Sequence, residues 1–355
     1  MRQAIFRAAA AFVAGLFVFS IPAATSAEGP ADAVLHAARY IATTQQPDGG
    51  FGGFGDGQTF DAIFALRSAG IDPAQVKSGG KSPVDFLNAR AVEQTQAASA
   101  AKAALAARAV NLDPRSLNGV DLLAIVSDSY DSPTGRYAAD DFSHGIAMLG
   151  LSCNGVDLPN GALNALRAAQ LGDGGWGFDG FSDPDTTAIA LQALIAAGVP
   201  ASDPSVAAAL AYFETTQAPD GGWGFTPTES NTSSTAYVVQ ALIAAGIDPR
   251  SPRFGAPMSP LDYLAAQQAP DGSFAGFDPA FATNQVVPAL AGRSFCYAPV
   301  TPASGGIPSA RPVAPLPPNT GSGSADPGSP ADGEALALVA LLLSVTAMGL
   351  AVKRR

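Results

Sequence analysis

Four stretches of the sequence follow one pattern: QQPDGGFGGF from Gln45, QLGDGGWGF from Gln170, QAPDGGWGF from Gln217 and QAPDGSFAGF from Gln268. Each reads Gln, two variable residues, Asp-Gly, then Gly or Ser, and then Phe or Trp. Each is followed by an apolar run of helical character that ends at a glycine, as helices often do. Repetition at such a period is typical of folds in which each unit packs against its neighbours.

Two weaker copies complete the series. One has Tyr137 in its loop and a helical run that ends at Gly155, and the other, between Gly70 and Gly155, keeps its second helix but has lost the loop. Each unit reads as two helices, of which the second is nearly all Ala, Leu, Ile and Val and therefore buried on most sides. No copy has the polar face that caps an open solenoid. The sequence therefore predicts an all-α fold, a single α6/α6 toroid of six helical hairpins over residues 28–296.

The N-terminal segment predicts secretion. Arg2 and Arg7 precede an apolar run from Ala8 to Ile21, and small residues follow up to Ala27. This order is typical of a cleaved signal peptide over residues 1–27. An uncleaved membrane anchor is the alternative, but the apolar run is short for a span.

The C-terminal segment predicts an anchor. Residues 297–334 are rich in Pro, Gly and Ser and predict a disordered stalk, while residues 335–352 contain no charge and precede a basic tail at 353–355. An 18-residue apolar run with a basic flank predicts a transmembrane helix with its tail in the cytoplasm. We therefore expect the folded part to be held at the cell surface, with the membrane as one partner.

A short motif within the stalk leaves the type of anchoring open. The sequence Pro317-Pro318-Asn319-Thr320-Gly321 resembles a sortase sorting signal of the L-P-x-T-G type, in which Thr320 and Gly321 would flank the cleaved bond. Pro317 stands where that signal has Leu, and the spacer before the apolar run is long. Covalent attachment to the cell wall and a plain membrane anchor both remain possible outcomes.

Composition excludes several classes of function. Acidic residues number 30 against 19 basic ones, and no Lys/Arg cluster lies in the interior of the chain, so nucleic acid is not an expected partner. With two histidines and two cysteines, we predict neither a metal nor a cofactor. Cys153 and Cys296 belong to units three and six, and an oxidising compartment permits a disulfide between them without requiring one.

The repeats resemble the QW repeats of the squalene cyclase and protein prenyltransferase superfamily, over about residues 30–295. This resemblance implies an α/α toroid whose inner helices surround an apolar cavity. It also implies structural roles for the repeat residues: the glutamines tie helix ends, and the aromatic residues pack against neighbouring units. These residues are Gln45, Gln170, Gln217, Gln268, Phe51, Trp176, Trp223 and Phe274.

The resemblance also points to a catalytic acid. Class II cyclases of this family carry D-x-D-D-T-A at the start of an inner helix, and the middle Asp protonates an alkene or epoxide. Here the stretch is Asp183-Pro-Asp-Thr-Thr-Ala188, so Asp185 matches the acid, Asp183 the first Asp, and Thr186 replaces the third. A general acid needs a carboxyl kept neutral by burial and neighbouring charge. The alternative role for Asp185 is a helix N-cap.

Further polar residues are expected near the starts of the inner helices. If all inner helices begin on one face, these side chains surround one mouth of the ring, where they could bind a cation or the polar head of a ligand. A solvated loop face is the alternative. The residues are Asp61, Asp140, Asp141, His144, Asp183 and Asp185.

Three functions from different classes remain. The sequence favours a non-catalytic surface module that binds an apolar or amphipathic ligand, or a surface protein, because the acid motif is incomplete and the stalk suits display. The second is an extracytoplasmic terpenoid cyclase, an isomerase that uses Asp185. The third is a structural scaffold whose ring centre is filled by side chains.

Overall fold

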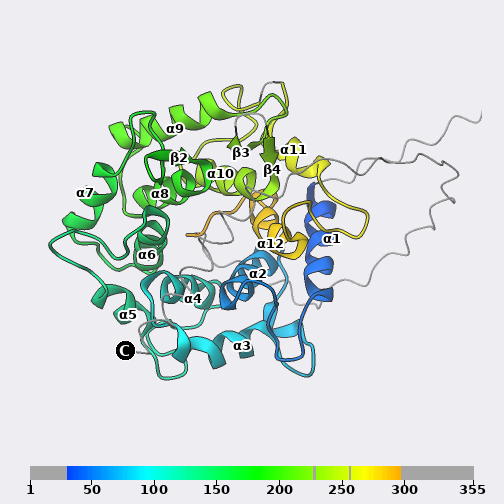
Figure 1. Ribbon diagram of the computed structural model, residues 1–355. Helices are drawn as coiled ribbons and strands as arrows, with labels where there is room; N and C mark the ends of the chain where they lie inside the picture. The colour runs from blue at the N-terminus through cyan, green and yellow to red at the C-terminus, as the bar shows by residue number, and fades with distance from the viewer. Residues whose placement is uncertain (1–29, 227–228, 256, 297–355) are drawn as a thin grey trace, which may run out of the picture.

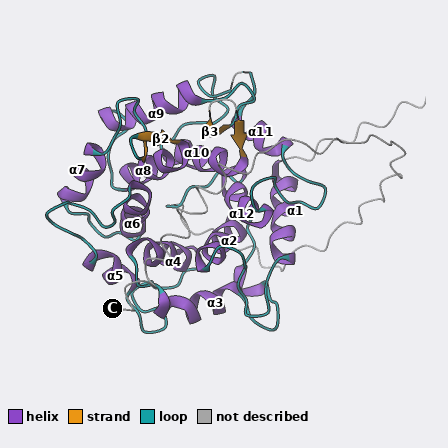
Figure 2. Ribbon diagram, in the orientation of Figure 1, coloured by secondary structure: helices purple, strands orange, loops and turns teal. Residues whose placement is uncertain are grey.

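A computed structural model describes residues 30–226, 229–255 and 257–296. These residues form twelve α-helices that alternate along the chain between an outer and an inner layer (Figures 1 and 2). The outer helices are α1 (Pro30–Thr43), α3 (Pro83–Arg90), α5 (Leu122–Asp128), α7 (Asn160–Ala168), α9 (Pro204–Thr216) and α11 (Pro260–Ala266). The inner helices are α2 (Asp56–Ser68), α4 (Ala97–Ala109), α6 (Asp141–Cys153), α8 (Pro184–Ala196), α10 (Thr232–Ala244) and α12 (Pro279–Leu290).

The inner helices form a closed ring. Each packs against the next, from α2 through α4, α6, α8 and α10 to α12, and α12 packs against α2. The outer helices surround this ring (Figure 2). The helix-rich architecture and the toroid are therefore as the repeats predicted. The predicted signal peptide, stalk and membrane span lie outside the described residues.

Small and branched apolar side chains allow the inner helices to pack closely. Ala101, Ala188 and Ala193 are fully buried, and so are the branched residues Val238 and Leu242. Helices α4 and α6 approach so closely that a Cβ added at Gly150 would lie 2.5 Å from the Cβ of Ala101. Removal of even one methyl group from such a closely packed interior affects its packing.

The repeat glutamines join each unit to the next. The Nε2 of Gln170 donates to the carbonyl of Gly174 in its own loop at 2.8 Å and to that of Ser205, at the start of α9, at 2.9 Å. Gln268 in the last unit donates in the same way to the carbonyl of Ala33 in α1, at 2.9 Å. This bond joins residues 235 positions apart and closes the outer layer of the ring.

Two short β-hairpins depart from the predicted all-α fold. Strand β1 (Trp176–Phe178) pairs antiparallel with β2 (Phe181–Asp183), and β3 (Trp223–Thr226) pairs with β4 (Glu229–Asn231). Asp179 and Gly180 connect β1 to β2 with φ angles of 50° and 83°, the backbone that a tight two-residue hairpin requires. The Asp-Gly pair between two aromatic residues is the sequence signal for this hairpin, and the repeat analysis missed it.

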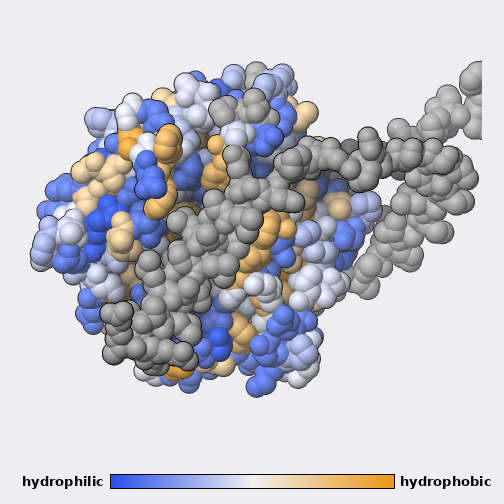
Figure 3. Space-filling model, in the orientation of Figure 1, coloured by the Kyte–Doolittle hydropathy of each residue, from blue (hydrophilic) through white to orange (hydrophobic). Residues whose placement is uncertain are grey.

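No helix within the described ranges is both long and apolar enough to cross a membrane. The space-filling view shows hydrophobic and hydrophilic side chains interspersed over the described part of the face that it presents (Figure 3).

Candidate functional site

Four of the inner helices, α6, α8, α10 and α12, begin with a side-chain cap, and two of the predicted mouth carboxylates serve this purpose. Asp140 accepts a hydrogen bond from the backbone N–H of Ser143, and Asp183 accepts one from that of Thr186, both at 2.7 Å. Such bonds satisfy amide groups that have no partner inside the helix. The N-cap of α8 is thus Asp183. The alternative prediction, that Asp185 caps this helix, is wrong.

Asp185 lies in the first turn of α8 and is 8% exposed. Its Oδ1 has no hydrogen-bond partner, although the Ser234 side chain hydrogen-bonds to the carboxyl group. Burial, and then the negative charge of Asp183, raise the pKa of Asp185 to about 7, and the Ser234 bond lowers it only in part. The Asp185 carboxyl therefore keeps its proton to a higher pH than an exposed carboxyl does and, in that form, can donate a proton or a hydrogen bond.

The other two mouth carboxylates have basic partners. Asp61 in α2 accepts a hydrogen bond from the Nζ of Lys102 in α4 at 2.7 Å. Burial raises the pKa of Asp61, and the positive charge of Lys102 opposes that rise. Asp141 forms an ion pair with Arg136. Asp185 thus differs from these neighbours, because it is neither a cap nor half of an ion pair.

His144 faces the outer layer. Its Nδ1 accepts a hydrogen bond from the backbone N–H of Tyr137 at 3.1 Å, and its Nε2 lies 3.2 Å from the carbonyl of Ala162 in α7. Only the tautomer with a proton on Nε2 satisfies both partners. Burial lowers the pKa of His144 to about 4. Both ring nitrogens are thus engaged within the protein.

The position of His144 is that of a threonine in four other units. In each of these units, a threonine hydroxyl accepts a 2.9 Å hydrogen bond from the backbone N–H of the repeat's aromatic residue. The pairs are Phe51 with Thr59, Trp176 with Thr187, Trp223 with Thr235 and Phe274 with Thr283. His144 makes the equivalent bond in the third unit, which explains why it aligns with Thr187 in the sequence.

The segment after α12 turns back into the middle of the ring (Figure 1). The ring of Phe295 stacks on that of Phe64 in α2, with 5.3 Å between centroids, and lies 6.5 Å from that of Tyr237 in α10. The backbone N–H of Phe295 donates to the Oε1 of Gln192 in α8 at 3.3 Å. A disulfide joins Cys296 to Cys153 at the end of α6. The structure thus contains the disulfide that the sequence left open.

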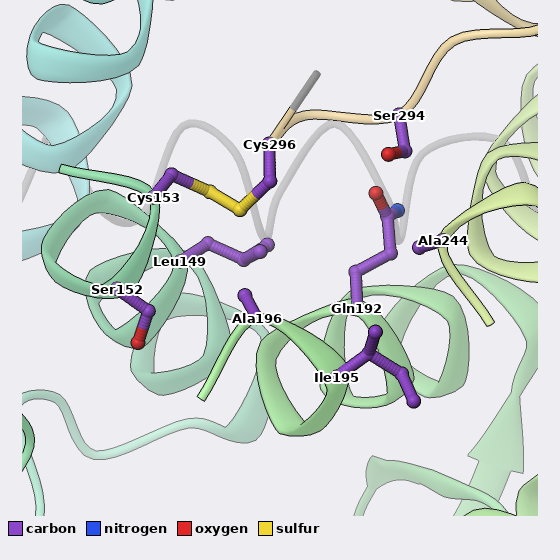
Figure 4. Close-up of a pocket in the computed structure, with 9 residues that line it drawn as sticks. All are labelled: Leu149, Ser152, Cys153, Gln192, Ile195, Ala196, Ala244, Ser294 and Cys296. Carbon is purple, nitrogen blue, oxygen red and sulfur yellow. A yellow bond between two sulfur atoms is a disulfide. The ribbon is translucent and has the colours of Figure 1, made fainter. Parts of the chain in front are cut away.

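A cavity of about 350 Å³ lies beside this segment, toward the C-terminal ends of α6, α8 and α10 (Figure 4). The amide of Gln192 points toward the segment that carries Ser294 and Cys296 (Figure 4). The Nε2 of Gln192 is buried and has no hydrogen-bond partner. The lining residues are Leu149, Ser152, Cys153, Gln192, Ile195, Ala196, Ala244, Ser294 and Cys296.

A second, much smaller cavity of about 10 Å³ is lined by Phe295 and by residues of α2 and α4, among them Asp61, Phe64 and Lys102. The sequence analysis named neither Gln192 nor Phe295. Gln192 could have been found as the polar residue in the apolar run AIALQALIAAG, but nothing in the local sequence marks Phe295. Among the described residues, no three His, Cys, Asp or Glu side chains converge as metal ligands would.

Residues 137–285 match the family of the squalene-hopene cyclase C-terminal domain. Among curated proteins, none matches this sequence significantly.

Solved structures show the same fold at low identity. A variant of the type II terpene cyclase MstE from Scytonema, in complex with geranylgeranyl dihydroxybenzoate as substrate, superposes with a TM-score of 0.59 at 16% identity, covering 74% of this chain and 97% of that one. The same enzyme without ligand superposes with a TM-score of 0.58, at the same identity and coverage. Haptocorrin in complex with Cbi gives 0.50 at 15% identity, covering 75% of this chain and 67% of that one. These likenesses show the toroid fold, and the family match over residues 137–285 and the repeats support a relationship to the squalene cyclase and terpenoid cyclase toroid superfamily.

Proposed function

We propose that this protein is a non-catalytic module on the outer cell surface that binds an amphipathic ligand in the 350 Å³ cavity. The unpartnered Nε2 of Gln192 carries the proposal. A buried donor without an acceptor costs about 1–3 kcal/mol, which a ligand oxygen at this position would recover. Binding sites of this size combine apolar walls with a few polar groups that orient the ligand.

The walls of the cavity define the rest of the ligand. Leu149, Ile195, Ala196 and Ala244 contribute apolar surface, and Gln192 offers a donor to a hydroxyl, carbonyl or carboxylate oxygen. An isoprenoid with an oxygen-bearing head matches both features, because its chain is apolar and its oxygen can accept the hydrogen bond. The substrate in the MstE complex, geranylgeranyl dihydroxybenzoate, joins an isoprenoid chain to a polar ring and is consistent with the same class. The predicted signal peptide and anchor would hold the domain outside the cell.

Substitution of Gln192 tests the proposal. We expect the wild-type protein to bind farnesol in calorimetric titrations and Gln192→Leu to bind it about tenfold more weakly, because the ligand hydroxyl loses its donor. Gln240→Leu is the matched control, since Gln240 occupies the equivalent position in α10 but does not line the cavity. Absence of farnesol binding by the wild-type protein, or equal loss in both variants, would contradict the proposal.

A second candidate is favoured by one observation, the buried and unpartnered carboxyl of Asp185 with its pKa raised to about 7. Such a group suits protonation of an alkene carbon. Ring closure onto the resulting cation, followed by loss of one proton to a base, would return an isomer of the substrate. Phe142 and Tyr237, whose rings meet edge to face at 6.2 Å, are aromatic groups of inner helices on either side of α8.

Incubation with geranylgeraniol tests this candidate. If Asp185 is a general acid, the wild-type protein yields a cyclic isomer detectable by mass spectrometry, and Asp185→Asn yields none because the amide cannot donate the proton. Asp140→Asn serves as the control, because asparagine also caps helices and Asp140 belongs to the neighbouring α6. Equal product from wild type and Asp185→Asn, or no product from wild type, would exclude the cyclase.

A further inference from the structure

Phe295 and its two chain neighbours line two separate cavities. The 350 Å³ cavity is lined by its neighbours Ser294 and Cys296, and the 10 Å³ cavity beside Asp61 and Lys102 is lined by Phe295 itself. Phe295 is 8% exposed and stacks on Phe64, with 18° between the two ring planes. The Phe295 side chain thus lies against the smaller cavity, while residues 294 and 296 on either side of it line the larger one.

Two contacts hold Phe295 in place. Its backbone N–H donates to the Oε1 of Gln192, the same side chain whose Nε2 has no partner. The next residue is joined covalently to α6 through the Cys153–Cys296 disulfide. Both cysteines line the larger cavity and are partly exposed, so a small thiol that enters this cavity reaches the bond.

We propose that residues 293–296 form a plug over an apolar site that is continuous with the cavity of the proposed function. The Phe295 side chain blocks this site, and the Cys153–Cys296 disulfide holds the plug in place. Reduction of the disulfide lets Phe295 leave, joins the two spaces, and admits the chain of a long isoprenoid as far as Phe64 and Leu105. The inference rests on the proposed function for the polar end of the ligand and adds a gated site for its apolar end.

The reductant is a dithiol. One of its thiolates attacks a sulfur of the Cys153–Cys296 bond and forms a mixed disulfide, and the other sulfur of the protein leaves as a thiolate and takes up a proton. The second thiol of the reductant then displaces the first protein sulfur. The protein gains two thiols, and the dithiol is oxidised to a cyclic disulfide. Because Cys153 and Cys296 are the only cysteines in the sequence, no other bond responds.

Titration of the full chain with geranylgeraniol tests the plug. We expect affinity to rise at least tenfold after treatment with dithiothreitol, in Cys153→Ser without a reductant, and in Phe295→Ala with the disulfide intact. Phe181→Ala is the control, since Phe181 is 78% exposed at the tip of the first hairpin and should leave the affinity unchanged. Circular dichroism spectra of all variants verify that the helices remain.

Hydrogen exchange provides a readout without a ligand. The amide of Phe295, which donates to Gln192, should exchange at least tenfold faster in the reduced protein, while the amides of the inner helices stay protected. Unchanged exchange on reduction would overturn the plug, and so would unchanged geranylgeraniol affinity in a reduced protein that binds farnesol. Failure of the oxidised protein to bind farnesol, with faster exchange on reduction, would refute the proposed ligand class and leave the plug supported.

Discussion

Trp176→Ala is expected to lower the free energy of unfolding by about 3–5 kcal/mol. The Trp176 side chain is fully buried, and its Nε1 donates to the carbonyl of Leu166 in α7 at 2.7 Å. Truncation leaves a cavity the size of an indole between the inner and outer layers, and it also leaves the carbonyl without its partner. Urea denaturation followed by circular dichroism measures the change.

The matched control is Phe178→Ala, two residues further along the same strand. The Phe178 side chain is 57% exposed, so its loss should change stability by less than about 0.5 kcal/mol. The pair separates burial from strand propensity, because both residues lie in β1. A similar change in both variants would show that the repeat aromatic does not hold the layers together.

Asp185→Asn is expected to stabilise the fold at pH 8 and to have little effect at pH 4. The pKa of Asp185 rises from 3.8 to about 7 on folding, so the native state holds a proton that the unfolded chain releases between these values. Stability from this group is therefore full below pH 4 and is lost as the pH rises to about 7. The loss is on the order of 4 kcal/mol, and asparagine, which does not ionise, avoids it.

Urea denaturation of both proteins at pH 4, 6 and 8 measures this difference. His144 acts in the opposite direction, because its pKa falls to about 4 on folding and its contribution is lost as the pH drops below 6.5. That contribution is shared by wild type and variant and cancels in the comparison. A constant difference between the two proteins at all three pH values would show that Asp185 does not hold a proton in the folded state.

Much of the fold could be predicted because it depends on local spacing. The glutamine, the Asp-Gly turn and the aromatic residue recur within each loop, and Thr187 or its equivalents follow about ten residues later. These contacts are short in sequence, so repetition reveals them. The hairpin at Asp179 and Gly180 has an equally local signal, the Asp-Gly pair, but a helical period does not reveal it because two-residue turns have no such period.

The candidate site was less predictable. The motif at 183–188 identified Asp185, but it could not distinguish a cap from an unpartnered acid, because Asp183 and Asp185 differ by two positions at the start of one helix. Only the packing of α8 against α10 places Ser234 beside one carboxyl oxygen and no partner beside the other. The unpartnered Nε2 of Gln192 likewise depends on tertiary packing.

By itself, the sequence determined the six units and the position of the acid motif, since both rest on residues close together in the chain, and it indicated closure only because no unit has a polar capping face. Only the tertiary structure decided that Cys153 bonds to Cys296, 143 positions away, and that Phe295 meets Gln192, 103 positions away. Such contacts depend on how a closed ring brings its last segment back across its centre, and no local period encodes that path.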